Sequence, residues 1–121
     1  PCDNEFERDF AKFLQSAGDV EAFSKLTEPF GFAIEYTDAA ANLRYYYPDF
    51  VVRSTTGENW IVETKGQETI ETERKAIAAQ IWCENATILT GATWRYLKVP
   101  QKDFEHLQPS LFSDIVVFWV E

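Results

Sequence analysis

Residues 45–66 read YYYPDFVVRSTTGENWIVETKG and contain two apolar runs that are separated by a turn signal. The runs are residues 50–53 and 60–62, and their Phe, Val, Ile and Trp side chains suit half-buried strands. Between them, residues 54–58 match a three-residue hairpin loop in which Gly57 takes the position that needs a positive φ. We therefore expect a β-hairpin, and if the residues flanking this loop pair with each other, paired residue numbers sum to 112.

This register places two carboxylates and an ammonium group on one face of the hairpin. Asp49 lies opposite Glu63, with Cβ atoms roughly 4.5–5.5 Å apart, and Lys65 follows two residues later on the same side. A four-residue loop would instead turn Glu63 away from Asp49 unless a bulge restored the site. Two adjacent carboxylates repel each other unless a cation lies between them, and Mg²⁺ prefers such oxygen ligands. With a lysine to stabilise developing charge, these are the parts that a phosphodiester hydrolase needs.

The motif formed by Pro48-Asp49 and Glu63-Thr64-Lys65 resembles that of the PD-(D/E)xK nuclease superfamily. The longer string around it is similar to the C-terminal endonuclease domain of type III restriction enzyme Res subunits and related DEAD/DEAH-box ATPases. The resemblance implies that Asp49, Glu63 and the carbonyl group of Thr64 bind Mg²⁺, for which Mn²⁺ substitutes, and that Lys65 serves the chemistry.

The same resemblance implies a function and its partners. We expect a metal-dependent, site-specific deoxyribonuclease, the cleavage module of a type III-like restriction system, acting on double-stranded DNA. A helicase-like ATPase domain in the same chain and a modification or specificity subunit are the implied protein partners. A competing hypothesis is a non-catalytic docking or assembly domain of a DNA-dependent ATPase with a relic nuclease site.

Composition limits the remaining possibilities. With 121 residues, 45% of them hydrophobic, the chain is expected to form one globular domain, residues 1–121. The absence of Met suggests a fragment of a longer helicase or ATPase chain. The net charge of −9 argues against a module that holds nucleic acid by charge alone, and is the observation behind the docking hypothesis. Two separated cysteines and no apolar stretch of membrane-spanning length favour a cytoplasmic protein without a membrane segment.

A helix is expected over residues 4–17. Its buried stripe consists of four residues at helical spacing, namely Phe6, Phe10, Phe13 and Leu14. Glu7 borders this stripe and stands three residues after Asn4, so it has two interpretations. It is either part of a capping box or, as the resemblance implies, a further acidic residue beside the metal.

The remaining elements predict an α/β (α+β) fold with a central mixed sheet of four to five strands, flanked by helices and restriction-endonuclease-like. We expect a connector over residues 19–26, strands at 32–36, 94–99 and 115–120, and short connectors at 43–47 and 87–91. Helices are expected at 68–85 and 101–107, and the first helix should close over the site.

The helix at 68–85 is expected to bury one apolar side, made of Ile70, Ile77, Ala78, Ile81 and Trp82. On the same helix, Lys75 and Gln80 are candidate DNA contacts. For Lys75, a solvated i,i+4 pair with Glu71 is the alternative.

Two further groups of side chains have alternative interpretations. Tyr45, Tyr46 and Tyr47 could stack on bases, but packing is the favoured interpretation. His106, the only histidine, is expected on an exposed helix face rather than in catalysis.

Overall fold

The computed structural model describes residues 5–26, 32–65 and 70–119, with the side chains of Lys65, Phe118 and Trp119 outside the described part. The described part contains four helices and six strands. In chain order these are α1 (Glu5–Ser16), β1 (Val20–Lys25), β2 (Ile34–Thr37), β3 (Leu43–Tyr46), β4 (Phe50–Ser54), β5 (Asn59–Lys65), α2 (Ile70–Thr90), β6 (Trp94–Pro100), α3 (Gln101–Leu107) and α4 (Phe112–Trp119). Asn4, the expected helix cap, lies outside the described residues.

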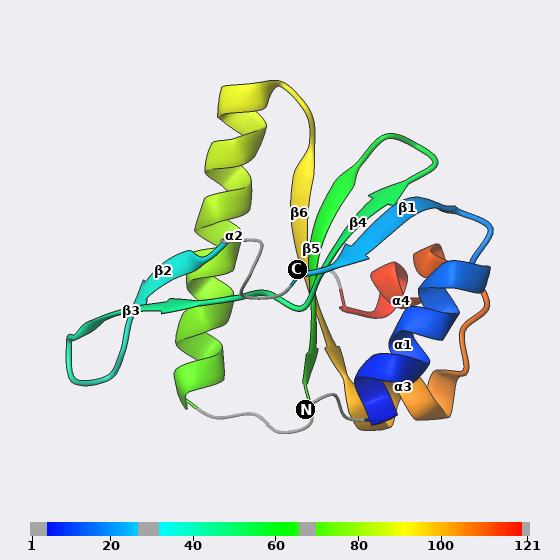
Figure 1. Cartoon of the computed structure of the whole chain (residues 1–121), viewed down its shortest axis with the longest axis horizontal. Coiled ribbons are helices and arrows are strands. Elements are labelled where there is room, and N and C mark those ends of the chain that lie inside the picture. The colour runs from blue at the N-terminus through cyan, green and yellow to red at the C-terminus, as the bar shows by residue number, and fades with distance from the viewer. Residues whose placement is uncertain (1–4, 27–31, 66–69, 120–121) are drawn as a thin grey trace.

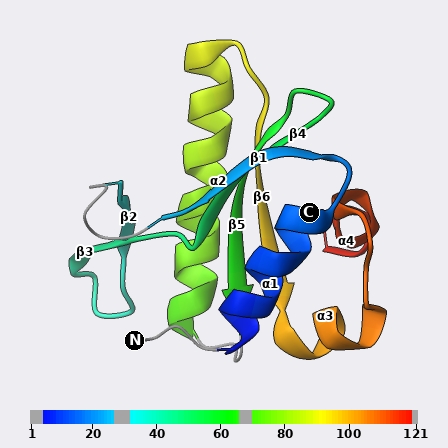
Figure 2. The same cartoon turned by 45° about the vertical axis from the view of Figure 1, so that its right-hand side comes forward.

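The central sheet has the strand order β1-β4-β5-β6 and is mixed, as predicted. β4 pairs antiparallel with β1 and β5, whereas β5 and β6 are parallel and α2 forms the crossover between them. Figures 1 and 2 show α2 on one face of this sheet and α1, α3 and α4 on the other. β2 and β3 form a separate two-stranded sheet that projects past α2. The fold class is therefore the expected one, a mixed sheet between layers of helices.

The hairpin between β4 and β5 has the predicted register. Paired residues run from Phe50 with Val62 to Arg53 with Asn59, so their numbers sum to 112. The backbone N–H of Ser54 donates to the carbonyl group of Glu58 over 2.9 Å, which closes the three-residue loop. Gly57 has φ +94°. A backbone with this φ strains any residue with a Cβ atom, which explains why glycine stands at this position.

Two apolar clusters hold the layers together. The first lies between the sheet and α1, α3 and α4, and it includes the predicted stripe of α1. Its fully buried members are Phe10, Leu14, Phe50, Val52, Trp60, Val62, Leu97, Val99, Phe112 and Ile115. The second lies between the sheet, α2 and the β2–β3 hairpin, and its buried members are Ile34, Tyr36, Tyr46, Ile61, Ala76, Ala79, Cys83 and Tyr96. Alternate residues of β5 therefore enter opposite clusters, as the pleat of a strand requires.

Four sequence predictions about the elements were wrong. The expected connector at 19–26 contains β1, an edge strand of mostly polar composition that gains its place by pairing with β4. The expected connector at 43–47 contains β3, whereas the strand expected at 32–36 is present as β2 and pairs with β3 outside the central sheet. Most of the expected connector at 87–91 is the last turn of α2, which ends at Thr90, and Gly91 follows with φ +78°. The strand expected at 115–120 overlaps the helix α4.

The prediction of which face of α2 is buried was also wrong. Ile70, Ile77 and Ile81 are exposed, whereas the face on the sheet consists of the small residues Ala76, Ala79 and Cys83. Small side chains let the axis of α2 approach the sheet closely. The close packing of this small-residue face stabilises the fold more than burial of the isoleucine side chains would. Trp82 and Ala78 are partly buried at the border of this face.

Candidate active site

The carboxylate of Asp49 is fixed where the β4–β5 ladder ends. Its Oδ2 accepts hydrogen bonds from the backbone N–H of Thr64 over 2.9 Å and from the Thr64 hydroxyl over 3.0 Å. The carbonyl group of Asp49 accepts the N–H of Leu26 over 2.8 Å. Asp49 is thus tied to the strands on both sides of β4, and its half-buried side chain has a defined position.

Glu63 and Asp49 lie at the same end of the hairpin, because they directly follow and precede Val62 and Phe50, the last pair of the β4–β5 ladder. The side chain of Glu63 is 2% exposed and lies on the α2 side of the sheet. There its Oε1 accepts a hydrogen bond of 2.7 Å from the hydroxyl group of Tyr96. A buried carboxylate is costly unless it has such partners, so this position is built around a charged or hydrogen-bonded group.

Two buried tyrosines surround this carboxylate. Burial and then the negative charge of Glu63 raise the pKa of Tyr96 and of Tyr46 far above the usual range. Both hydroxyl groups therefore stay protonated and act as donors. The hydroxyl of Tyr46 also donates to the carbonyl group of Lys75 over 3.3 Å. Of the three consecutive tyrosines, Tyr46 is used in packing, while Tyr45 and Tyr47 are exposed.

Lys98 is a second basic residue at this place that the sequence did not indicate. It pairs in register with Glu63 on the parallel strand β6, and it is two residues from Tyr96 on the same face. No local sequence signal reports a parallel register across a helical crossover, so neither Lys98 nor Tyr96 could have been found from the motif. Lys65 ends β5, and its side chain lies outside the described part.

Glu7 lies on α1, the helix that covers the opposite face of the sheet. Its Oε1 forms an ion pair of 3.0 Å with Nζ of Lys25, which is on β1 and pairs with Phe50. This geometry gives Glu7 a basic partner at the end of β4. Whether Glu7 also acts on a cation stays a prediction.

The two candidate DNA contacts on α2 lie on its half-buried side. Nζ of Lys75 lies 5.4 Å from the ring centroid of Tyr46 and 5.7 Å from that of Tyr36. Glu71 accepts a hydrogen bond from the hydroxyl group of Tyr36. Lys75 and Glu71 therefore contact the same tyrosine, and Lys75 is held close to the second apolar cluster. His106 is exposed on α3, as predicted.

The donor atoms at the end of β4 and β5 fit a hard cation. Within the described residues, no group of three or more His, Cys, Asp or Glu side chains could hold a metal ion. Two neighbouring carboxylates match the demand of Mg²⁺, which takes one or two protein carboxylates and completes its octahedron with water and phosphate oxygens.

A family model described as Endonuclease domain matches residues 1–102. The chain belongs to this endonuclease-domain family. The match covers α1, the whole central sheet, α2 and the first residues of α3. No curated protein and no solved structure matches the chain.

Membership in this family supports a hydrolytic, nuclease function for the endonuclease domain. The elements that carry Asp49, Glu63 and Lys98 all lie within the matched residues. No helix in the described part of the endonuclease domain has both the length and the apolar character for crossing a membrane.

Proposed function

We propose that this endonuclease domain hydrolyses phosphodiester bonds of DNA with the help of Mg²⁺. The observation that carries the proposal is the carboxylate of Asp49, held by the N–H and hydroxyl groups of Thr64 beside the buried carboxylate of Glu63. Burying one carboxylate next to another is unfavourable, and a divalent cation bound between them would offset the repulsion.

Asp49, Glu63 and the carbonyl group of Thr64 would hold the ion, and Mn²⁺ should substitute for Mg²⁺. When bound, such an ion polarises a phosphoryl oxygen and lowers the pKa of a bound water. Lys65 orients the attacking water and stabilises charge on the transition-state oxygens. Glu7 is proposed as a further acidic group near the ion. Tyr96 holds the Glu63 carboxylate in place through its hydrogen bond.

The net charge of −9 is the observation behind the proposed partners of the domain. Tight binding to DNA relies on lysine and arginine contacts to phosphates, which an acidic domain supplies poorly. We therefore propose that the domain is the cleavage module of a cytoplasmic, type III-like restriction enzyme. A helicase-like ATPase domain in the same chain would grip the double-stranded DNA, and a modification or specificity subunit would choose the site.

Cleavage by the complete enzyme tests this proposal. The Lys65→Ala and Asp49→Ala variants should lose Mg²⁺-dependent cleavage while keeping the circular dichroism spectrum of the wild type. Lys102→Ala is the matched control, because Lys102 is an exposed lysine of α3. Cleavage at the wild-type rate by Lys65→Ala and Asp49→Ala, or by an enzyme from which this domain is deleted, would instead support a non-catalytic docking domain.

A further inference from the structure

The carboxylate of Glu63 is buried beside the second apolar cluster. Glu63 follows Ile61 on the same face of β5, and Ile61 is a member of that cluster. Burying a carboxylate costs free energy even when it is hydrogen-bonded, and apolar side chains of similar volume often stabilise a fold better than buried charged groups. Stability therefore does not explain why a carboxylate stands at this position, whereas a need for a fixed negative charge does.

Tyr96 approaches Glu63 from the neighbouring strand β6. It pairs in register with Ile61, two residues before Glu63, so the three side chains lie on one face of the sheet. Two residues of a strand span about 6.6 Å, and the tyrosine side chain extends along this direction. Its hydroxyl group donates the hydrogen bond of 2.7 Å to Oε1 of Glu63. Tyrosine thus combines an apolar ring that packs in the cluster with a donor that reaches the carboxylate.

Tyr46 approaches the same carboxylate from the β2–β3 hairpin. Burial raises the pKa of Tyr46, and the charge of Glu63 and a hydrogen bond to it raise that pKa further. The hydroxyl group of Tyr46 also lies 3.3 Å from the carbonyl oxygen of Lys75. A hydroxyl group has one proton, and a charged acceptor makes the stronger hydrogen bond, so the carboxylate is its main acceptor. Glu63 therefore has hydroxyl donors from two elements outside its own strand.

We propose that Tyr46 and Tyr96 are positioning residues that hold the Glu63 carboxylate in the orientation in which it binds a divalent cation. This inference rests on the proposed function and extends it to a pair of residues outside the motif. Partners that hydrogen-bond a metal-binding side chain fix its orientation, and the loss of one typically weakens metal binding by about 10- to 100-fold. The charge of Asp49 also raises the pKa of both tyrosines, which indicates that the second candidate ligand lies near the same two hydroxyl groups.

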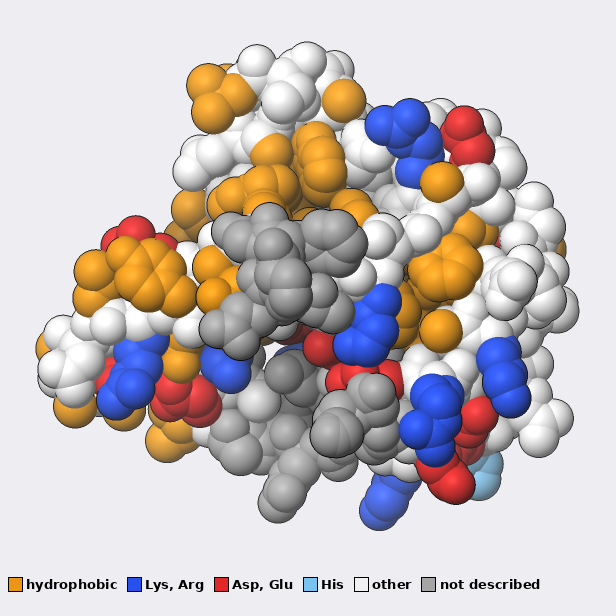
Figure 3. All heavy atoms as spheres, viewed as in Figure 1, with side chains coloured by type: hydrophobic (Ala, Val, Ile, Leu, Met, Phe, Trp, Pro, Cys, Tyr) orange, Lys and Arg blue, Asp and Glu red, His pale blue; other side chains and the backbone are white. Residues whose placement is uncertain are grey.

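The surface charge of the domain makes the position of the cation important. On the face shown in Figure 3, the described Lys and Arg side chains are interspersed with Asp and Glu and form no continuous basic surface. The net charge of the whole chain is −9. Because basic side chains supply few contacts to phosphates, binding of a phosphodiester group relies on the cation and on the placement of its ligands.

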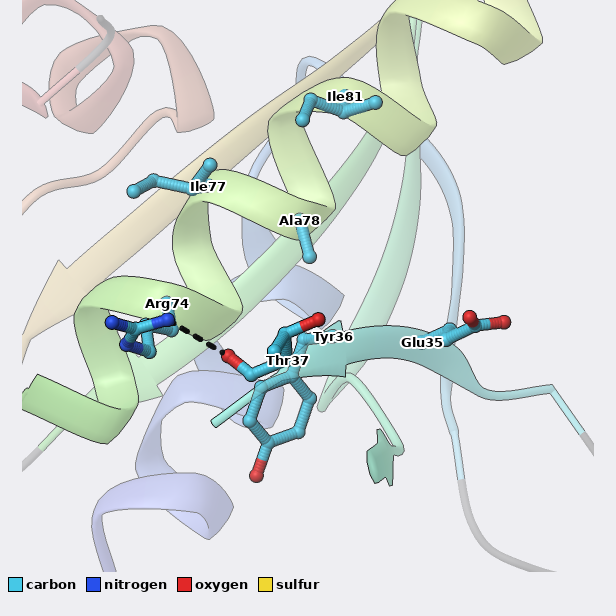
Figure 4. Close-up of a pocket in the computed structure, with 7 residues that line it drawn as sticks. All are labelled: Glu35, Tyr36, Thr37, Arg74, Ile77, Ala78 and Ile81. Atoms are coloured by element: carbon cyan, nitrogen blue, oxygen red, sulfur yellow. Dashed lines mark hydrogen bonds between the residues drawn. The ribbon is translucent and has the colours of Figure 1, made fainter. Parts of the chain in front are cut away.

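Tyr36 provides a matched comparison for the two positioning residues. It is 7% exposed, as is Tyr46, and the two rings are in contact in the same cluster, with centroids 5.9 Å apart. Its hydroxyl group also donates to a carboxylate, that of Glu71. Tyr36 lies on β2, at a groove of about 340 Å³ between β2 and α2 (Figure 4). Removing its hydroxyl group therefore disturbs the same cluster without taking a donor from Glu63.

Calorimetric titration of the purified chain with Mn²⁺ tests the proposal. Tyr96→Phe and Tyr46→Phe should each weaken binding by about tenfold or more. Tyr36→Phe should bind Mn²⁺ as the wild type does, although it also loses a buried hydroxyl group. Circular dichroism and urea unfolding of each variant establish that it is folded during the titration. The rise in Tm on addition of Mn²⁺ gives the same comparison for a variant of low stability, because a ligand stabilises the folded chain according to its affinity.

The outcomes distinguish this proposal from the proposed function. Wild-type affinity in Tyr96→Phe or in Tyr46→Phe would overturn the paired positioning role, and so would an equal loss in Tyr36→Phe. In these cases the proposed function would stand if Glu63→Gln still abolished binding. A wild type that does not bind Mn²⁺ would overturn both the positioning role and the proposed function.

Discussion

The hydroxyl group of Tyr96 on β6 donates a hydrogen bond of 2.7 Å to Oε1 of Glu63 on β5. The two residues are 33 positions apart in the sequence and are separated by the whole of α2. Because Glu63 is 2% exposed, this contact supplies part of the solvation that the carboxylate loses on burial. The parallel pairing of β5 and β6 thus sets the position of a residue that the proposed function assigns to metal binding.

Removing this hydroxyl group should destabilise the domain. In Tyr96→Phe the ring keeps its packing, but a buried carboxylate loses a donor, which costs about 1–3 kcal/mol. Urea unfolding measures the difference. Tyr45→Phe is the control, since Tyr45 is 62% exposed and should tolerate the loss of its hydroxyl. Equal stability of the two variants would show that the contact contributes nothing.

The start of α4 depends on a carboxylate from a distant part of the chain. Asp19 accepts the backbone N–H groups of Phe112 over 2.7 Å and of Ser113 over 2.9 Å. These N–H groups have no partner within the helix, so Asp19→Ala should lower the free energy of unfolding by about 1 kcal/mol. Urea unfolding of Asp9→Ala, an exposed aspartate of α1, provides the comparison. A loss of the same size in both variants would contradict the capping role.

The stability of the β2–β3 turn should depend on pH in the acid range. The Arg44 side chain, at 2.7 Å, and the N–H of Asn42 lower the pKa of Asp38 from 3.8 to about 2. A carboxyl group whose pKa is lower in the folded chain stabilises the fold above its unfolded pKa and loses this contribution as pH falls through the folded pKa. The stability difference between the wild type and Asp38→Asn should therefore be constant above about pH 5, where the carboxyl group is ionised in both states, and shrink toward pH 2. Urea titrations across this range measure it, and a pH-independent difference would refute the assignment.

The hairpin could be predicted from sequence because its determinants are local. The loop length and Gly57 set the register, and the register places Asp49 and Glu63 at the same end of the hairpin. The partners of Glu63 could not be predicted in this way. Tyr96 arrives through the register of a parallel pair, which depends on how α2 crosses the sheet rather than on neighbouring residues.

Three errors had non-local causes as well. The apolar residues of α4 suit a buried strand. However, Asp114 of α4 accepts the backbone N–H groups of residues 110 and 111, and the distant Asp19 accepts those of residues 112 and 113. These hydrogen bonds favour a helix. β1 is a polar edge strand whose order comes from pairing with β4. The large apolar side chains of α2 led to the wrong prediction of its buried face, because small residues pack against the sheet there.

Titration of the chain with Mn²⁺ tests the central claim most directly. Calorimetry should detect a divalent-cation site in the wild type, with heat that is lost in both Asp49→Asn and Glu63→Gln, because each variant replaces a charged ligand by a neutral one of similar shape. Lys65→Met should keep the binding heat, since the proposal gives Lys65 a role in the chemistry and none in holding the ion. Binding of Mn²⁺ by Asp49→Asn and Glu63→Gln with the affinity of the wild type would contradict a metal site at these two carboxylates.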